Sequence, residues 1–484
     1  MKLLPNLSRS IFYSVVLAGL SQLSLAASPM ESEPAAKNVI LIIGDGMDDQ
    51  QITAARNYLH GAQGQTILDT LPIRSAVQVL TVSNENPSQP IYVADSANSA
   101  TAMATGNITS IGRISTSAKT DQDFTTIVEL AQQKGLKTGL VTTASLTDAT
   151  PAAFYSHVNM RGCEGPEQMV NFESYGDFVI DCHEDTQALG GKGSISEQLA
   201  NSNVDVLLGG GKKFFKQAPE KSDQALSKQD TKTVLKMAEK NDFKIIKRLD
   251  EAKAINKEEK ILGLFAKKHL PVRWQGTDGR VAEKPQYSFL HLFHRYLGSV
   301  TLPEVMKCEA NPEFEKQQTP NLAHMSELAL TRLDNPKGFF LMIESASIDK
   351  QSHKRNPCGH IGEAQQLFET VQVALNYAKQ QGNTLVMITA DHGQAAQIVP
   401  DGSLFSAFGA PIATPGFLAR IETREGGVMA MNYATNDFSH EEHTGVNVPF
   451  FANKQVKDKA GKDLITPMLK QTDVFHISKK HLGL

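Results

Sequence analysis

Short apolar runs without polar alternation recur along the 484-residue chain. The five clearest are NVILII (38–43), TGLVTTA (138–144), VDVLLGG (204–210), GFFLMIE (338–344) and NTLVMITA (383–390). Such continuous runs are typical of strands that are covered on both faces, as in parallel sheets. Between them, TTIVELAQQKG and IGEAQQLFETVQVALNYAKQQG carry the three-to-four spacing of amphipathic helices and end at glycine. The pattern predicts an α/β protein with a largely parallel sheet.

Four of these runs end at, or are soon followed by, a carboxylate. The acids are Asp45, Asp148, Glu344 and Asp391. In open α/β sheets, ligands bind outside the carboxyl ends of the strands. Four acids gathered at one rim would repel each other unless a cation held them. We therefore expect a cation site at this rim.

Residues 212–335 have a different character. They are rich in lysine, with charged helical patterns and little strand signal, so we expect a variable accessory insert of solvated elements outside the sheet. Inside it, YSFLHLFHRYLGS (287–299) is unusually aromatic. Local core, an oligomer contact and a surface that meets a substrate are all open interpretations of this stretch. No internal repeat or low-complexity linker divides the chain, which favours one elaborated domain over residues 27–484.

The amino terminus has the pattern of a secretory signal peptide over residues 1–26. Lys2 and Arg9 precede the apolar stretch 11–20, and a small-x-small pattern ends at Ala26. A membrane anchor is the alternative, but the apolar run is far shorter than the roughly 20 residues that span a bilayer. The sequence predicts an exported chain, periplasmic or secreted, with no membrane association after cleavage.

The net charge and the cysteines indicate which partners and which covalent links to expect. A net charge of −4 provides no general basic footprint for nucleic acid. The four cysteines, an even number in an exported chain, predict disulfides; they are Cys163, Cys182, Cys308 and Cys358. Three pairings are possible, and the one between sequence neighbours, 163 with 182 and 308 with 358, is the most economical. No C-x2-C spacing supports a zinc–thiolate site.

Three histidines stand next to acids in patterns that suit a metal. IDKQSH places Asp349 and His353 four residues apart, on one face of a helix. TADHG places His392 directly after Asp391, and EEHTG supplies His443, with His440 as a nearby competitor. Each histidine alone is weak evidence, but together they favour zinc, which accepts nitrogen and oxygen ligands in tetrahedral sites.

The stretch YVADSANSATAMATG (92–106) raises the question of a nucleophile. Asp95 and Ser96 precede a run of small side chains, so Ser96 is either a residue at a helix start or a catalytic hydroxyl. The chain has no G-x-S-x-G, S-x-x-K or H-E-x-x-H motif at a suitable place, and GGGKK (209–213) lacks P-loop spacing. A nucleophilic Ser96 would therefore need a metal to lower its pKa.

Several short motifs occur along the chain in an order and combination that is highly specific for one protein family. They are GDGM (44–47), ADSANSATA (94–102), DATPAA (148–153), HVNMRGC (157–163), GKGSISEQL (191–199), IESASIDKQSH (343–353), NPCG (356–359), TADH (389–392) and EHTG (442–445). With them, the chain resembles the bacterial alkaline phosphatases from about residue 37 to its end. The resemblance implies a three-layer α/β/α fold, with a large, mostly parallel central sheet and a small crown-like accessory region, and a homodimer.

The resemblance also implies a site with two zinc ions and one magnesium ion per chain. One zinc ion would be held by Asp349, His353 and His443, the second by Asp45, Asp391, His392 and Ser96, and the magnesium ion by Asp45, Thr150 and Glu344. This division has chemical sense, because magnesium takes oxygen ligands while the imidazoles go to zinc.

Further roles follow from the same resemblance. Ser96 would form a phosphoserine, and Arg161 would clamp two phosphate oxygens with its planar fork. Asp95 would orient Arg161, while Asp148 and Lys350 would bias the third site toward magnesium. One departure from the family pattern is Asp48 after GDGM, which brings extra negative charge near the metals.

The function implied is an exported phosphomonoesterase of broad specificity for small phosphate monoesters. A phosphodiesterase or sulfatase on the same metal platform is the nearest alternative. Arg161 and the magnesium-type ligands argue against it, because a dianionic monoester needs that additional positive charge. A phosphate- or metal-binding module without turnover is the alternative from another class, and the complete nucleophile set argues against it.

Overall fold

The computed structural model of the protein describes residues 37–173, 179–219, 233–294, 296–402 and 414–484. The predicted signal peptide, 1–26, lies outside these residues. Residues Ala36–Leu484 form one compact unit. Among the described residues, no helix is both long and apolar enough to cross a membrane.

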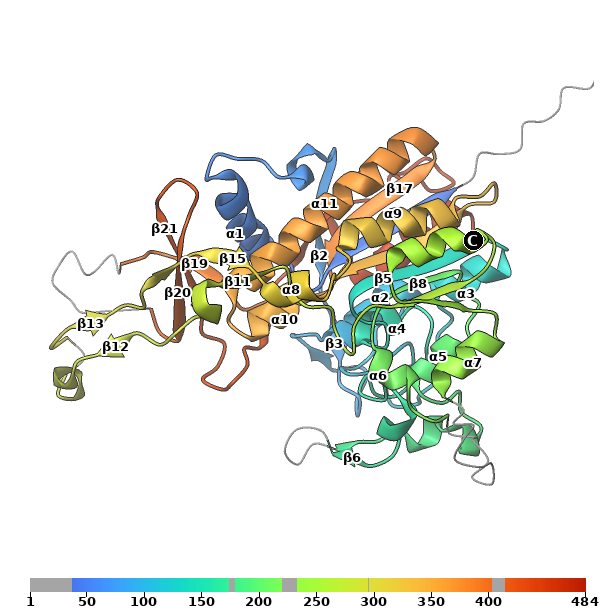
Figure 1. Cartoon of the computed structure of the whole chain (residues 1–484), viewed down its shortest axis with the longest axis horizontal. Helices are drawn as coiled ribbons and strands as arrows, with labels where there is room; N and C mark the ends of the chain where they lie inside the picture. The colour runs from blue at the N-terminus through green and yellow to red at the C-terminus, as the bar shows by residue number, and fades with distance from the viewer. Residues whose placement is uncertain (1–36, 174–178, 220–232, 295, 403–413) are drawn as a thin grey trace, which may run out of the picture. The chain divides into compact units, whose positions relative to one another are not determined.

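A ten-stranded sheet forms the centre of this unit (Figure 1). In spatial order its strands are β24 (Met468–Lys470), β2 (Ile73–Gln78), β23 (Val448–Ala452), β17 (Thr384–Ala390), β1 (Asn38–Gly44), β16 (Phe339–Ser345), β5 (Lys137–Ser145), β8 (Val206–Gly210), β10 (Ile261–Leu264) and β9 (Lys244–Ile246). From β17 to β9 every neighbouring pair is parallel, whereas β23 is antiparallel to both of its neighbours. The predicted, mostly parallel sheet is confirmed, and its five apolar runs are β1, β5, β8, β16 and β17.

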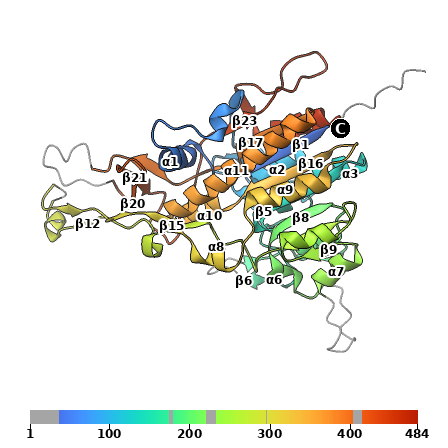
Figure 2. The same ribbon diagram turned by 45° about the horizontal axis from the view of Figure 1, so that its top comes forward.

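Helices cover both faces of the sheet, as expected for a three-layer α/β/α fold. On one face α9 (Leu322–Leu333) and α11 (Pro357–Gln381) lie across β5, β16, β1 and β17 (Figure 2). On the other face lie α3 (Ile127–Gln133), α4 (Ala149–Ala152) and α12 (Gln471–Leu482), with α2 (Ser96–Thr105) packed against α12. The remaining helices are α1 (Asp49–His60), α5 (Ile195–Ala200), α6 (Lys212–Phe215), α7 (Val234–Lys240), α8 (Pro312–Lys316) and α10 (Ser347–His353). Because both faces are covered, β1, β16 and β17 are buried along their whole length.

The expectation that residues 212–335 stay outside the sheet is wrong in part. Two strands from this region, β9 and β10, extend the central sheet beyond β8. Helix α9 also comes from it and buries Leu322, Met325 and Leu333 against the sheet. These elements escaped the sequence analysis because β9 and β10 are only three and four residues long and lie between charged segments.

A smaller region with its own apolar core stands apart from the central sheet. Its sheet has the order β14 (Val305–Met306), β20 (Phe417–Glu422), β21 (Val428–Tyr433) and β19 (Gln397–Val399). Beside it β11 (Trp274–Gly276) pairs with β15 (Cys308–Ala310). Three further short pairs are β3 (Thr81–Val82) with β4 (Pro90–Ile91), β6 (Phe172–Glu173) with β7 (Val179–Ile180), and β18 (Gly393–Gln394) with β22 (His443–Thr444).

Both disulfides join sequence neighbours, as the sequence predicted. Cys163 pairs with Cys182, and Cys308 pairs with Cys358. The second bond ties β15 of the small region to the first turn of α11, so it fastens the small region to the helix that covers the central sheet.

The aromatic stretch 287–299 forms the end of a hairpin. Strand β12 (Gln286–Tyr287) pairs with β13 (Val300–Thr301), at the left of Figure 1. Phe289, Leu292 and Phe293 are 69%, 88% and 73% exposed. Local core is therefore excluded as the role of these side chains.

Candidate active site

The four strand-end acids meet at one rim of the sheet. Asp45 follows β1, Asp391 follows β17, Glu344 lies near the end of β16, and Asp148 caps α4 just after β5. These four strands are adjacent and parallel, so their carboxyl ends share an edge. Burial and the charges of Asp391 and Asp349 raise the pKa of Asp45 well above its usual value. The rim thus concentrates buried negative charge, as the sequence predicted, and favours a cation.

Asp349, His353 and His443 form the first group of possible metal ligands. His353 Nε2 lies 3.3 Å from Asp349 Oδ1 and 3.1 Å from His443 Nε2, and His443 Nε2 lies 3.5 Å from the same Asp349 oxygen. Ligands about 2.0–2.1 Å from a tetrahedral zinc ion are separated by about 3.3 Å. The three atoms already have that spacing, because helix α10 presents two of them and the β18–β22 pair brings in the third.

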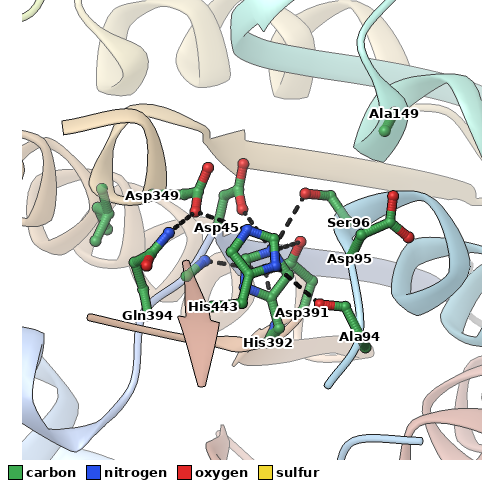
Figure 3. Close-up of polar contacts among 12 residues, drawn as sticks. Asp45, Ala94, Asp95, Ser96, Ala149, Asp349, Asp391, His392, Gln394 and His443 are labelled. Atoms are coloured by element: carbon green, nitrogen blue, oxygen red, sulfur yellow. Dashed lines mark hydrogen bonds and ion pairs between the residues drawn. The ribbon is translucent and has the colours of Figure 1, made fainter. Parts of the chain in front are cut away.

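The second group contains Asp45, Asp391, His392 and Ser96 (Figure 3). His392 Nε2 lies 3.4 Å from Asp45 Oδ1, 3.4 Å from Asp391 Oδ2 and 3.2 Å from Ser96 Oγ. Both carboxylate oxygens are buried and have no hydrogen-bond partner within the described part of the chain. Two orphaned, buried carboxylate oxygens fit a cation, because leaving them unpaired in the interior is costly.

The three histidines are oriented for metal binding in the same way. His353 Nδ1 contacts the carbonyl of Glu441, His392 Nδ1 lies 3.1 Å from the carbonyl of Gly393, and His443 Nδ1 lies 2.8 Å from the carbonyl of Ala94. A carbonyl can only accept, so each Nδ1 carries the proton and each Nε2 is left with its lone pair. All three lone pairs then face the two ligand groups.

His392 cannot serve both groups, although its Nε2 also lies near Asp349 and His443. Because His353 completes the first ligand group with Asp349 and His443, we assign His392 to the second group. His440, the competitor of His443, is exposed and bonds to the neighbouring Ser439.

Oxygen donors gather next to the second group. Glu344 accepts hydrogen bonds from the hydroxyls of Thr142 and Thr150, and it contributes to the raised pKa of Asp45. Burial raises the pKa of Glu344 to about 7. Asp45, Thr150 and Glu344 offer oxygen atoms alone, and this donor set suits magnesium.

Ser96 is the first residue of α2, where it points into the second ligand group (Figure 3). Asp95 caps the helix by accepting from Asn98 N at 3.1 Å, and Asp95 N in turn donates to Asn98 Oδ1 at 2.8 Å. Asp95 is therefore the capping residue of α2, and Ser96, although it begins the helix, directs its hydroxyl at the site. Backbone N–H groups at the start of this ten-residue helix favour an anion there.

Arg161 lies between two carboxylates at the same rim. Its Nη1 is 3.1 Å from Asp95 Oδ2, and its Nη2 is 3.2 Å from Asp148 Oδ1. Lys350 Nζ approaches Asp148 at 2.8 Å and Asp45 at 3.7 Å. Despite burial, these acids raise the pKa of Arg161 and Lys350, and Lys350, His269 and Arg161 lower the pKa of Asp148. Both cations are thus held charged and in place.

Three residues at the site were missed by the sequence analysis. Gln394 donates from Nε2 to Asp349 Oδ1, Glu441 ties the loop before His443 to Arg355, and Thr142 bonds Glu344. No motif signals them, because their partners lie 45, 86 and 202 residues away in the sequence and are brought close only by the fold. Asp48 caps α1 by accepting from Gln50 N, and burial raises its pKa to about 6.

Comparisons with known proteins place the chain in one family. A sequence profile described as alkaline phosphatase matches residues 36–483. The chain is 38% identical over 465 residues to the alkaline phosphatase of Escherichia coli (strain K12), covering 94% of this chain and 87% of that one. It is 36% identical over 466 residues to streptomycin-6-phosphate phosphatase of Streptomyces griseus, covering 94% of each.

A solved structure supports the fold. The alkaline phosphatase from the Antarctic bacterium TAB5 matches with a TM-score of 0.62 at 23% identity, over 93% of this chain and 99% of that one. The chain belongs to the alkaline phosphatase family, whose members are metal-dependent phosphoric monoester hydrolases.

Proposed function

We propose that the protein hydrolyses small phosphate monoesters of broad range through a phosphoserine on Ser96. The observation that carries this proposal is the position of Ser96 Oγ, 3.2 Å from His392 Nε2 within one of two groups of donor atoms spaced as the ligands of tetrahedral zinc. If bound there, two zinc ions and a neighbouring magnesium ion would supply positive charge to the attacking and leaving oxygens.

The zinc ligands are proposed to be Asp349, His353 and His443 in one site and Asp45, Asp391, His392 and Ser96 in the other. The magnesium ligands are Asp45, Thr150 and Glu344. The division is supported by the orphaned oxygens of Asp45 and Asp391, the free Nε2 atoms of the histidines and the all-oxygen set around Glu344.

The protein's own groups hold the phosphate for in-line attack by Ser96. Arg161 is the residue that binds two phosphate oxygens, because its fork matches them and its charge is secured by Asp95 and Asp148. The backbone N–H groups at the start of α2, next to Ser96, add further hydrogen-bond donors for the phosphate. Attack by Ser96 Oγ on phosphorus breaks the ester P–O bond, and the alcohol leaves with that oxygen. Water then hydrolyses the phosphoserine, which releases phosphate and regenerates the Ser96 hydroxyl.

Export and dimer formation complete the proposal. The signal pattern over 1–26 and two disulfides support a periplasmic or secreted protein. A homodimer is proposed from the family alone, and the domain is proposed to extend over 27–484. Nucleic acid is not proposed as a partner, because the net charge is −4.

Replacing the nucleophile tests the proposal. Ser96→Ala is expected to lower kcat for a simple aryl phosphate by about a thousandfold or more. Ser99→Ala is the matched control, because Ser99 is also buried on α2 and its hydroxyl has no partner among the described residues. Equal activity of Ser96→Ala and the native protein would refute the mechanism. Faster hydrolysis of a diester or a sulfate ester than of the monoester would favour the alternative activity.

A further inference from the structure

The rim that carries the acids continues into a cluster of lysines. Strand β8 lies beside β5, with Gly210 opposite Ser145, and β10 lies beside β8. All three strands are parallel, so the segments that leave β8 and β10 emerge at the edge that also carries Asp148. In α/β sheets this is the edge where ligands bind.

Five lysines surround a cavity of about 390 Å³ at this place: Lys212, Lys213, Lys216, Lys247 and Lys267, together with Phe265 and Gln317. No acid lines the cavity. Within the described ranges of the chain, none of these five ammonium groups forms an ion pair. The rim therefore has an acidic part that favours cations and a basic part whose ammonium groups form no ion pair among the described residues, although the charge of Glu164 acts on Lys213.

The glycine run GGGKK, which does not fit a P-loop, accounts for how the lysines are held together. Gly211 N donates to the carbonyl of Lys268 at 2.7 Å, and Lys213 N donates to the carbonyl of Lys267 at 3.0 Å. A Cβ at Gly210 would lie 1.9 Å from the Lys268 carbonyl oxygen, so only glycine permits this approach. The backbone thus fixes like charges side by side.

Holding these charges together has an electrostatic cost. Burial and the charges of Lys268 and Lys267 lower the pKa of Lys213, although the charge of Glu164 opposes this shift. Like charges that the backbone keeps close repel each other unless an anion neutralises them. The lysine pocket therefore favours an anion, just as the acidic part of the rim favours a cation.

The lysine pocket is connected to the phosphate side of the active site. Lys267 and His269 are two residues apart, at most about 7 Å along the chain. His269 Nδ1 lies 3.7 Å from Asp148 Oδ2, and Asp148 contacts Arg161. A ligand that contacted both Arg161 and the lysines would have to extend past Asp148, and would therefore be longer than a single phosphate.

We propose that this lysine pocket binds the distal phosphates of a substrate that carries a chain of linked phosphates, while the terminal phosphate sits at Ser96 and Arg161. The inference rests on the proposed function. The chemistry is unchanged: Ser96 Oγ forms a bond to the terminal phosphorus, the bridging P–O bond breaks, and the shortened chain leaves with the bridging oxygen and its electron pair. Water then releases phosphate from Ser96.

The test measures binding separately from turnover. In the Ser96→Ala background, titration calorimetry would follow binding of medium-chain inorganic polyphosphate. Adding Lys216→Gln, Lys247→Gln and Lys267→Gln removes three exposed charges and should raise the Kd about tenfold, with the effect weakening as salt is added. The control removes three exposed lysines elsewhere, Lys337→Gln, Lys379→Gln and Lys462→Gln, and should change the Kd less than about twofold.

In the presence of Ser96, the lysine variant should keep the kcat and KM of the native protein for an aryl phosphate. An unchanged Kd, an equal change in the control, or an equal rise in KM for the aryl phosphate would each overturn the inference. Absence of aryl phosphate hydrolysis by the native protein would instead contradict the proposed function and leave the binding result valid by itself.

Discussion

Gln394 is expected to set the metal affinity of the first ligand group, although it is not itself a ligand. It is 2% exposed, donates from Nε2 to Asp349 Oδ1, and accepts from Ala395 N at 2.7 Å through Oε1. Gln394→Leu keeps a side chain of similar shape and removes the donor. Asp349 would then lose the bond that directs its carboxylate toward His353 and His443.

The size of the effect follows from that one bond. A hydrogen bond to a charged group contributes about 1.5–3 kcal/mol. Loss of a partner that orients a metal ligand typically weakens metal affinity by about 10–100-fold. We therefore expect the zinc Kd of the Asp349 site to rise by about 10–100-fold, with the affinity of the Asp45 site much less affected.

Competition with a chromophoric chelator measures this directly on the purified protein. The matched control is Gln397→Leu, because Gln397 is an exposed glutamine that borders the same cavity as Gln394 but does not contact Asp349. Zinc affinity within about twofold of the native value in Gln394→Leu, or an equal loss in Gln397→Leu, would refute the reasoning.

Three further predictions concern the phosphate clamp, a disulfide and a buried acid. Arg161→Lys should lower kcat/KM for an aryl phosphate by about 10–100-fold, because lysine cannot bind two oxygens in one plane; unchanged kinetics would speak against the clamp. Removing the Cys308–Cys358 bond by a double change to serine opens a loop with a sequence separation of 50. It should lower the free energy of unfolding in denaturant by about 4 kcal/mol, and an unchanged midpoint would contradict this. Burial raises the pKa of Glu363 from 4.5 to about 7, so its contribution to stability is present below pH 4.5 and is lost as the pH rises through about 7. In Glu363→Gln, the free energy of unfolding should fall less between about pH 5 and about pH 8 than in the native protein, by about 2–3 kcal/mol. An identical fall in both proteins would exclude this contribution of Glu363.

The parts of the fold that could be predicted are those with a strong local signal. Strands β1, β16 and β17 lie in the middle of the sheet, and burial on both faces requires long apolar runs. Strands β9 and β10 lie at one end of the sheet and are too short to show such a run. The small region combines segments near residues 274–310 and 397–433, and no local pattern could join them.

In the site, too, only residues with a local sequence signal could be predicted. Asp45, Glu344 and Asp391 were predictable, because each lies at or directly after the end of a strand whose direction determines which edge it reaches. Gln394 and Glu441 were not, since their partners are 45 and 86 residues away and are reached only through loops. The lysine pocket likewise depends on the pairing of β8 with β10, which the charged sequence around them did not reveal.

The central claim is that Ser96 carries the phosphate between the two halves of the reaction. The most direct measurement is to quench the zinc- and magnesium-loaded protein in acid during turnover of a phosphate monoester and to locate covalent phosphate by peptide mass spectrometry. We predict phosphate on the peptide that contains Ser96, and none on that peptide in Ser96→Ala. Turnover without any phosphorylated Ser96, or phosphate on another residue instead, would contradict the account.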